Sequence, residues 1–165
     1  MIEDRRPWWL SPWLSIRVQL ALGALFVAAA IPKIADPPTF AHMVYNYRML
    51  PGAAINAMAL LLPWVELFAG LALLVGFWKR TAAGLTGLLL FVFILALGFN
   101  LARDNPVNCG CFDLRAKEKP RAELLSEMRW TILRDGGMLL LVAQVLAANR
   151  EKRGQTPKTG SDPDP

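Results

Sequence analysis

The chain has 165 residues, of which 55% are hydrophobic and only 19% are charged, with a formal net charge of +5 and a mean hydropathy of +0.35. Average soluble domains carry about 45–50% apolar and about 25% charged residues, so this composition argues against an ordinary soluble domain. The basic residues flank apolar segments, as in membrane proteins, and no sequence signature of a nucleic-acid-binding fold accompanies the positive charge.

Four long apolar segments predict membrane-spanning helices, because a hydrocarbon core of about 30 Å needs about 20 helical residues. The predicted spans are residues 14–34, 53–78, 81–101 and 128–148. We therefore expect an all-α fold, an integral membrane four-helix bundle formed by one domain over residues 14–148. An aromatic and basic lead (1–13) precedes it. A tail (149–165) follows that is rich in Pro, Gly and Asp and is expected to be disordered.

The first span follows two arginines and three tryptophans, and indole rings favour the headgroup level of a bilayer. A secretory signal peptide is the alternative, with Arg5-Arg6 as its basic start and Ala28-Ala29-Ala30 near a cleavage site. The length of the segment and its tryptophan anchor favour a span.

Pro32 and Pro37-Pro38 are expected to end the first span, and a short helix is predicted after it. Thr39 is its expected cap, and its length suits a helix lying flat at the membrane interface. One apolar face is formed by Phe40, Met43, Val44 and Tyr47. His42, the single histidine, lies off that face, which favours an exposed position over a metal or proton role.

Glu66 lies near the middle of the second span, next to Pro63, which can kink the helix. A carboxylate at the bilayer centre is costly and needs a partner or a proton. We expect Glu66 to face the bundle interior, either in a proton-handling role or as a neutral hydrogen-bonded group, with Lys33 as a candidate counter-charge. Burial predicts a largely protonated side chain, for which Glu66→Gln would be tolerated in folding.

Small and charged residues mark the last two spans. Gly84 and Gly87 are expected to allow close helix approach in the third span. Arg134-Asp135 is expected to form a self-compensating pair in the fourth, near its Trp130 interface anchor.

Both cysteines lie in one loop, as Cys109-Gly110-Cys111, after the turn-forming residues Asn105-Pro106. A disulfide across one glycine departs from relaxed geometry, and such strain makes it easier to reduce. Redox chemistry is therefore favoured. A metal site and inert cysteines stay open as alternatives, although two thiolates fall short of the four ligands of a structural zinc site. No metal is assigned.

Four spans place both termini and the Lys79-Arg80 turn on one side of the membrane and the cysteine loop on the other. The short basic turn and the Arg5-Arg6 start favour cytoplasmic termini, so the cysteines are expected outside the cytoplasm, where disulfides persist. Two cysteines cannot relay electrons across the membrane by themselves. They need an external thiol partner or a membrane-soluble carrier such as a quinone, unless the protein is only an accessory.

Motifs along the chain resemble the MauE/DoxX family of bacterial membrane proteins, and the last one resembles its MauE branch. They are Lys33 with Asp36-Pro37 and Phe40, Tyr47, Leu50-Pro51, Leu62-Pro63-Trp64, Glu66, Gly70, Asn100 and Cys109-Gly110-Cys111-Phe112. The resemblance covers residues 14–148 and implies a four-helix protein of the bacterial inner membrane. It also implies a role beside a thioredoxin-like protein in the maturation of a disulfide-rich periplasmic enzyme, methylamine dehydrogenase. The chain has Asp113 where many relatives have glycine.

Three functions remain open at this stage. The first is thiol–disulfide exchange by Cys109 and Cys111 with a thioredoxin-like partner; whether this makes the protein an enzyme is undecided, and a quinone is the one cofactor considered. The second is a non-enzymatic assembly or scaffold subunit, or a metal-binding protein. The third, a small-molecule transporter, depends on Glu66 alone.

Overall fold

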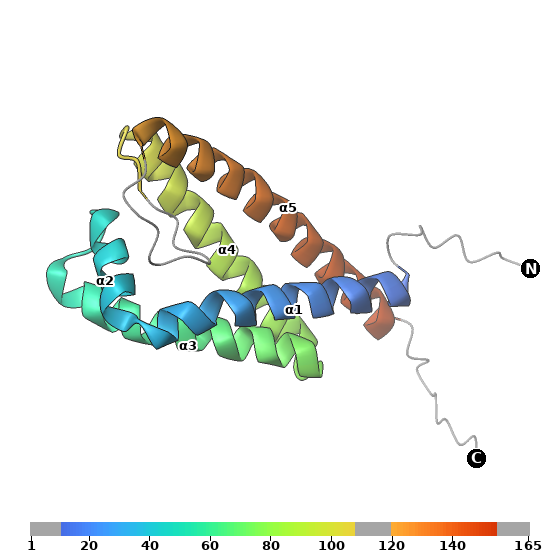
Figure 1. The fold of residues 1–165 in the computed structure, drawn as a ribbon. Coiled ribbons are helices and arrows are strands. Elements are labelled where there is room, and N and C mark those ends of the chain that lie inside the picture. The colour runs from blue at the N-terminus through green and yellow to red at the C-terminus, as the bar shows by residue number, and fades with distance from the viewer. Residues whose placement is uncertain (1–10, 108–119, 155–165) are drawn as a thin grey trace, which may run out of the picture.

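The computed structural model of the protein describes residues 11–107 and 120–154. These residues form five helices and no strand (Figure 1). The helices are α1 (Pro12–Ala35), α2 (Pro37–Asn46), α3 (Gly52–Val75), α4 (Lys79–Ala102) and α5 (Arg121–Gly154).

Four of the described helices, α1, α3, α4 and α5, are long and apolar enough to cross a membrane. Their outer faces carry large apolar side chains, such as Leu61, Phe68 and Leu140, which are 65%, 62% and 74% exposed. Apolar surface of this extent is unfavourable in water and suits a hydrocarbon environment. The expected all-α membrane four-helix bundle is confirmed.

The four long helices are arranged as two pairs, α1 with α3 and α4 with α5, that meet at one end and separate toward the other (Figure 1). A single core fills the end where the pairs meet, and it draws Leu22, Leu73, Leu90 and Val145 from all four helices. At the other end the core divides into a cluster between α2 and α3 and a cluster between α4 and α5. Among the described residues, the core is therefore continuous at the first end of the bundle and divided into two clusters at the second.

Glycines set the closest helix contacts. A Cβ atom on Gly23 would lie 2.9 Å from the carbonyl oxygen of Gly70, and one on Gly70 would lie 2.9 Å from that of Gly23, so α1 and α3 cross backbone to backbone. Gly87 allows the expected close approach, because a Cβ there would lie 3.0 Å from Val142 Cγ1 on α5. The same expectation for Gly84 is wrong: no atom lies within 4 Å of a Cβ built there.

Asp36 forms the junction between α1 and α2. Its N–H donates to the carbonyl of Pro32 at 3.1 Å, and its Oδ1 accepts from the N–H of Thr39 at 3.3 Å. Pro32 therefore lies inside α1, which continues to Ala35, and Thr39 is a first-turn residue of α2 rather than its cap. The two prolines after Asp36 explain the shift, since proline is well suited to the first turn, where its missing N–H is not needed.

α2 turns steeply away from the direction of α1 and packs on α3 (Figure 1). Its side chains Phe40 and Met43 are buried, and they pack around Ala59 and Leu62. The predicted apolar face is therefore directed at the bundle.

Two long helices end differently from the apolar segments that predicted them. α3 stops at Val75 because Gly76, at φ 76°, takes the left-handed conformation that terminates helices and donates its N–H to Ala72. α5 begins at Arg121 and continues to Gly154, beyond the predicted residues at both ends. Its additional turns are polar, so hydropathy alone does not detect them.

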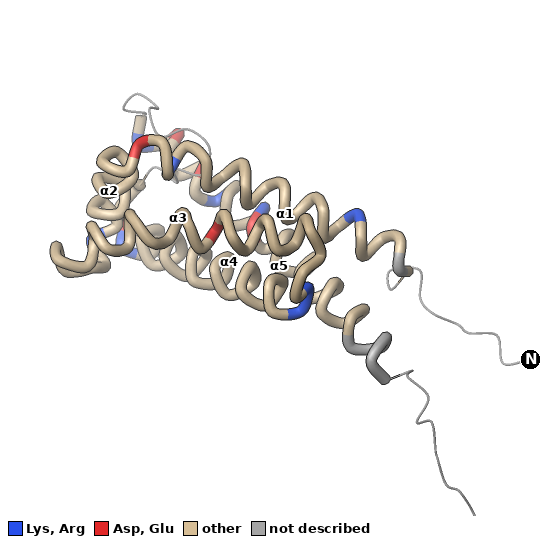
Figure 2. Tube along the Cα trace, turned by 90° about the horizontal axis from the view of Figure 1, so that it is seen from below, with Lys and Arg blue, Asp and Glu red and all other residues tan. Residues whose placement is uncertain are grey.

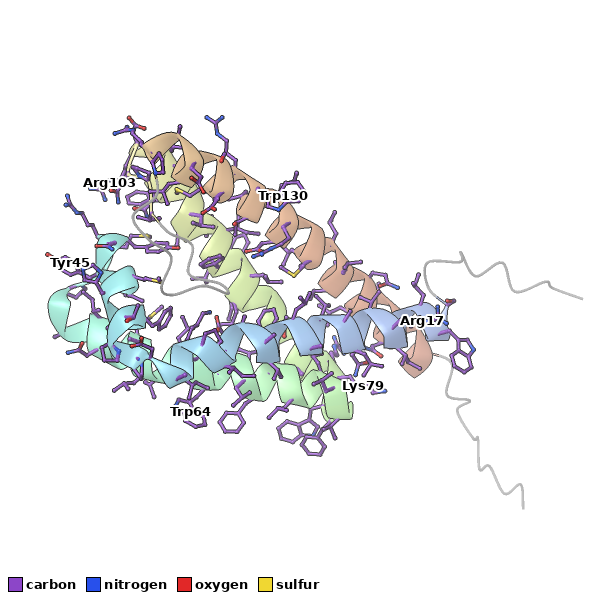
Figure 3. The ribbon with its side chains drawn as sticks, viewed as in Figure 1. Arg17, Tyr45, Trp64, Lys79, Arg103 and Trp130 are labelled. Carbon is purple, nitrogen blue, oxygen red and sulfur yellow. The ribbon has the colours of Figure 1, made fainter. Side chains whose placement is uncertain are left out.

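The beginning of α1, the α3–α4 turn and the end of α5 lie at one end of the bundle, and α2 lies at the other with the end of α4 and the beginning of α5 (Figure 1). Arg17 and Lys79 lie near the first end, and Tyr45 and Arg103 near the second (Figure 3). Charged positions are sparse along the middle of the bundle and more frequent toward the ends (Figure 2). This is the arrangement predicted for a four-span protein whose termini share one side.

Candidate functional site: a buried charge cluster and the stem of the cysteine loop

An ion pair joins α1 to α3 inside the bundle. Nζ of Lys33 lies 2.8 Å from Oε1 and 2.6 Å from Oε2 of Glu66. The side chains are only 8% and 14% exposed. Glu66 therefore faces the interior, as expected, and Lys33 is its counter-charge. Lys33 Nζ also lies 5.3 Å from the ring centroid of Phe40 on α2, a favourable cation–π position.

The expectation of a protonated Glu66 assumed burial without a cation. In the structure, both carboxylate oxygens accept from one ammonium group, which is the geometry of a charge-assisted pair. This geometry favours a Glu66 carboxylate that stabilises the cation of Lys33. The protonated Glu66 expected from the sequence stays a prediction, which the Glu66→Gln variant tests.

A second pair of opposite charges lies across a cavity from the first. Nε and Nη2 of Arg134 each lie 3.0 Å from Oδ1 of Asp135, whose side chain is 2% exposed. This confirms the predicted self-compensating pair. All four side chains line one cavity of about 180 Å³. Two basic and two acidic side chains are therefore grouped inside a largely apolar bundle.

A second cavity, of about 240 Å³, extends from the Lys33–Glu66 pair toward α2. It is lined by α1, α2, α3 and α4 and includes Met43, Tyr47 and Met49 at the α2 end. The two cavities share the lining residues Lys33, Glu66, Leu89 and Phe93. The ion pair therefore lines both cavities, at the level where the α1–α3 pair and the α4–α5 pair separate.

Asn100 and Asn105 organise the chain just before the cysteines. Asn100 is fully buried; its Nδ2 donates to the carbonyl of Ala96 at 2.9 Å and its Oδ1 accepts from Asn105 Nδ2 at 2.8 Å. Asn105 Nδ2 also lies 3.1 Å from the carbonyl of Asn46 at the end of α2. The end of α4 is therefore tied to α2 by an asparagine network.

Val107 completes this stem. Its side chain is 4% exposed and packs with Leu97 and Met128, and its N–H donates to Met128 Sδ at 3.4 Å. Asp104 and Arg121 form an ion pair where the chain returns into α5. Residues 100–107 and these contacts form the stem of the cysteine loop.

The predicted redox residues Cys109 and Cys111 lie outside the described residues, so their chemistry stays a prediction. Two peptide links separate Cys109 from Val107, and the stem therefore determines where the cysteine loop leaves the bundle. That point lies at the end opposite the beginning of α1, as predicted (Figure 1).

His42 is exposed, and its Nδ1 lies 3.5 Å from Nδ2 of Asn46. It is not part of the buried charge cluster. Sequence reasoning missed the roles of Gln19, which is buried and donates to the carbonyl of Leu73, and of the Asn100–Asn105 network. The available signal was a polar amide inside or at the end of an apolar segment, since such groups need hydrogen-bond partners in a membrane.

The fold and the buried charges define a multi-pass membrane protein of four spans with a polar centre and a loop anchored at one surface. A family model described as "Methylamine utilisation protein MauE" matches residues 11–148, and the chain belongs to this family. The MauE part of the resemblance is thereby confirmed.

Curated relatives that carry the name Methylamine utilization protein MauE match the chain. The protein from Methylophilus methylotrophus is 34% identical over 135 residues, which cover 81% of this chain and 70% of the relative. The proteins from Paracoccus denitrificans and Methylorubrum extorquens are 36% and 33% identical over 62% and 66% of this chain, and the matches span 56% and 59% of those relatives. No solved structure matches the chain.

Proposed function

We propose that this protein is a cytoplasmic-membrane accessory protein of bacterial methylamine utilisation, and that Cys109 and Cys111 exchange thiol–disulfide equivalents with an extracytoplasmic thioredoxin-like partner. The names of its relatives support the metabolic setting. The thioredoxin-like partner is inferred from the family resemblance and from the chemistry of the cysteine pair.

The observation that carries the proposal is the stem. Buried contacts of Asn100 and Val107 hold the chain immediately before the only two cysteines of the sequence, at one end of the bundle. Exchange with a soluble partner requires a thiol pair that is held at the surface and can be reached in one orientation. A structural disulfide offers a weaker explanation, because a loop closed over one residue removes little unfolded-state entropy.

The exchange proceeds in two balanced steps. A thiolate of the partner attacks one sulfur of the Cys109–Cys111 disulfide; a new intermolecular S–S bond forms and the second cysteine leaves as a thiolate. The second thiolate of the partner then attacks the partner's sulfur atom in the mixed disulfide. The partner's internal disulfide forms, and the first cysteine is released as a thiolate. Two electrons pass from the partner to this pair, and the reverse sequence oxidises the pair again.

The orientation belongs to the proposal. Lys79 and Arg80 were predicted to form a turn but are the first two residues of α4, directly after the short connection at the end of the bundle where α1 begins. Basic residues beside a short connection favour the cytoplasmic side. The stem then lies on the extracytoplasmic side, where a thiol pair can be maintained as a disulfide.

Trapping of a mixed disulfide tests the proposal. In the reverse direction, a thiolate of this pair attacks the partner's disulfide and the second cysteine completes the exchange. Cys109→Ala and Cys111→Ala each leave one thiolate without that second cysteine, so a single variant should accumulate a reductant-sensitive adduct that mass spectrometry identifies as a thioredoxin-like protein. The double alanine variant is the matched control and should form none. If both single variants accumulate in the membrane and neither forms such an adduct, the exchange is excluded, and an assembly or scaffold role is favoured instead.

A further inference from the structure

The two cavities beside Lys33 are not explained by thiol exchange at the surface. They lie within the part of the bundle built from membrane-spanning helices and have volumes of about 180 and 240 Å³. Small-molecule pockets measure about 300–1,000 Å³ and are apolar with a few polar groups, and the two spaces together fall within that range. A ligand that enters them must itself be soluble in a bilayer.

We propose that these cavities bind one isoprenoid quinone, with a ring carbonyl next to Lys33, as the electron acceptor of the cysteine pair. The binding part stands on the cavities alone, whereas the electron-transfer part rests on the proposed function.

The ammonium group of Lys33 favours a ligand whose ring carries a hydrogen-bond acceptor. An ammonium group has three N–H donors, and within the described residues its hydrogen bonds go to the two oxygens of Glu66. A third donor is thus left for an acceptor on a ligand. A quinone carbonyl is such an acceptor on an otherwise apolar ring, whereas a lipid acyl chain has none. Phe40 and Phe93 contribute aromatic surface to the larger cavity, on which a flat ring can pack.

The larger cavity reaches the stem of the cysteine loop. Tyr47 lines that cavity and also packs against the cluster of Leu97, Val107 and Met128. The wall of the ligand space and the anchor of the loop are therefore continuous.

Electron balance requires an acceptor outside the cysteine pair. The chain has two cysteines, so no second pair can take electrons from Cys109 and Cys111. In the step we propose, both thiols lose a proton and one electron each, an S–S bond forms, and the quinone oxygens receive the two electrons and two protons to give a quinol.

Binding is tested with the full chain in nanodiscs loaded with a ubiquinone that carries a short isoprenoid tail. Quinone retained above that in empty discs is quantified after extraction, with farnesol as a probe that has the isoprenoid chain but no quinone ring. Ala29→Phe fills the smaller cavity, and Ala28→Phe places the same ring on the exposed face of α1 as the matched control. We expect retention to fall about tenfold in Ala29→Phe, because the added ring keeps the quinone carbonyl away from Lys33 and the ligand loses one hydrogen bond to a charged group. Retention should be unchanged in Ala28→Phe.

If Ala29→Phe does not fold, Ala96→Phe in the larger cavity replaces it, with Leu95→Phe, whose parent side chain is 55% exposed, as the control. Equal retention by all variants, equal retention of farnesol, or recovery of phospholipid alone would overturn the binding proposal. These results would leave mixed-disulfide trapping unaffected, so the two proposals fail separately.

The redox arm uses the same discs. Quinone added to reduced protein should oxidise the cysteine pair in the wild type and in Ala28→Phe, and about tenfold more slowly in Ala29→Phe. Retention of quinone without oxidation of the pair would overturn its role as the electron acceptor.

Discussion

Lys33 on α1 holds both carboxylate oxygens of Glu66 on α3, at 2.8 and 2.6 Å, inside a bundle whose surroundings are apolar. Attraction between opposite charges is strong where water is excluded, but separating the pair leaves a charge that the environment cannot solvate. The pair therefore binds α1 to α3 midway along the bundle, at the point where the helix pairs begin to separate.

Replacing Glu66 by Gln should destabilise the protein, because Lys33 loses its counter-charge while it stays buried. We expect a loss of about 3–5 kcal/mol in the free energy of unfolding, measured by denaturation in detergent micelles. The double variant Lys33→Met/Glu66→Gln removes both charges and should recover most of that loss. Equal stability of the wild type and Glu66→Gln would support the neutral, protonated Glu66 that the sequence alone suggested. Normal stability with lost activity would instead indicate the proton-handling role.

The crossing of α1 and α3 predicts a second stability effect. Gly70→Ala places a Cβ 2.9 Å from the carbonyl oxygen of Gly23 and 3.0 Å from the backbone nitrogen of Val27. Relieving these contacts requires the two helix backbones to move apart. We expect destabilisation of about 1–3 kcal/mol in the same unfolding measurement. Gly84→Ala, where the added methyl group meets nothing within 4 Å, is the control and should be neutral or stabilising by up to about 1 kcal/mol. A neutral Gly70→Ala would show that the crossing is looser than described.

The four spans and the Lys33–Glu66 pair could be predicted from the sequence for a simple physical reason. Apolar runs of this length have few alternatives to spanning, and few buried cations were available to Glu66, so Lys33 could be named in advance. Whether Gly84 or Gly23 faces a neighbouring helix or the lipid depends on the rotation of its helix about the helix axis. An apolar sequence with weak periodicity does not show which face of the helix is buried. The crossing at Gly23 and Gly70 was therefore missed, while Gly84 was assigned a contact that it does not make.

The stem was also beyond sequence reasoning. Asn100 was named only among the residues that carry the family resemblance, because its partner Asn105 and the carbonyl of Asn46 come together only after α2 has folded back on α3. The first turns of α5 were missed because residues 121–127 include two glutamates, an arginine and a serine, and hydropathy does not distinguish such a mixed helix from a loop.

The stem predicts an effect on the cysteines at a distance. Asn100→Leu keeps a side chain of similar size but loses the hydrogen bonds to Asn105 and to the carbonyl of Ala96, so the anchor of the loop is loosened. We expect faster alkylation of Cys109 and Cys111 in the reduced protein, with an unfolding free energy lowered by about 1–3 kcal/mol. Asn56→Leu on the exposed face of α3 is the control. Identical alkylation rates in the two variants would show that the stem does not control the accessibility of the cysteines.

The proposed orientation predicts opposite locations for two connections. Reporter fusions after Arg80, at the beginning of α4, should report the cytoplasm. Fusions after Lys119, just before α5, should report the extracytoplasmic side. The same location for both fusions would contradict the number of spans. Exchanged locations would place the cysteines in a reducing compartment and remove the basis for an oxidising role.

Redox cycling of Cys109 and Cys111 is tested most directly by labelling intact cells with a membrane-impermeant, mass-tagged thiol reagent before and after mild reductant. We expect few tagged chains before reduction and two tags per chain after it, because a surface-exposed, strained disulfide is readily reduced. The double variant Cys109→Ala/Cys111→Ala should take up no tag and should lose function in methylamine utilisation. Labelling that reductant does not change, together with full function of the double variant, would contradict a redox role for the pair.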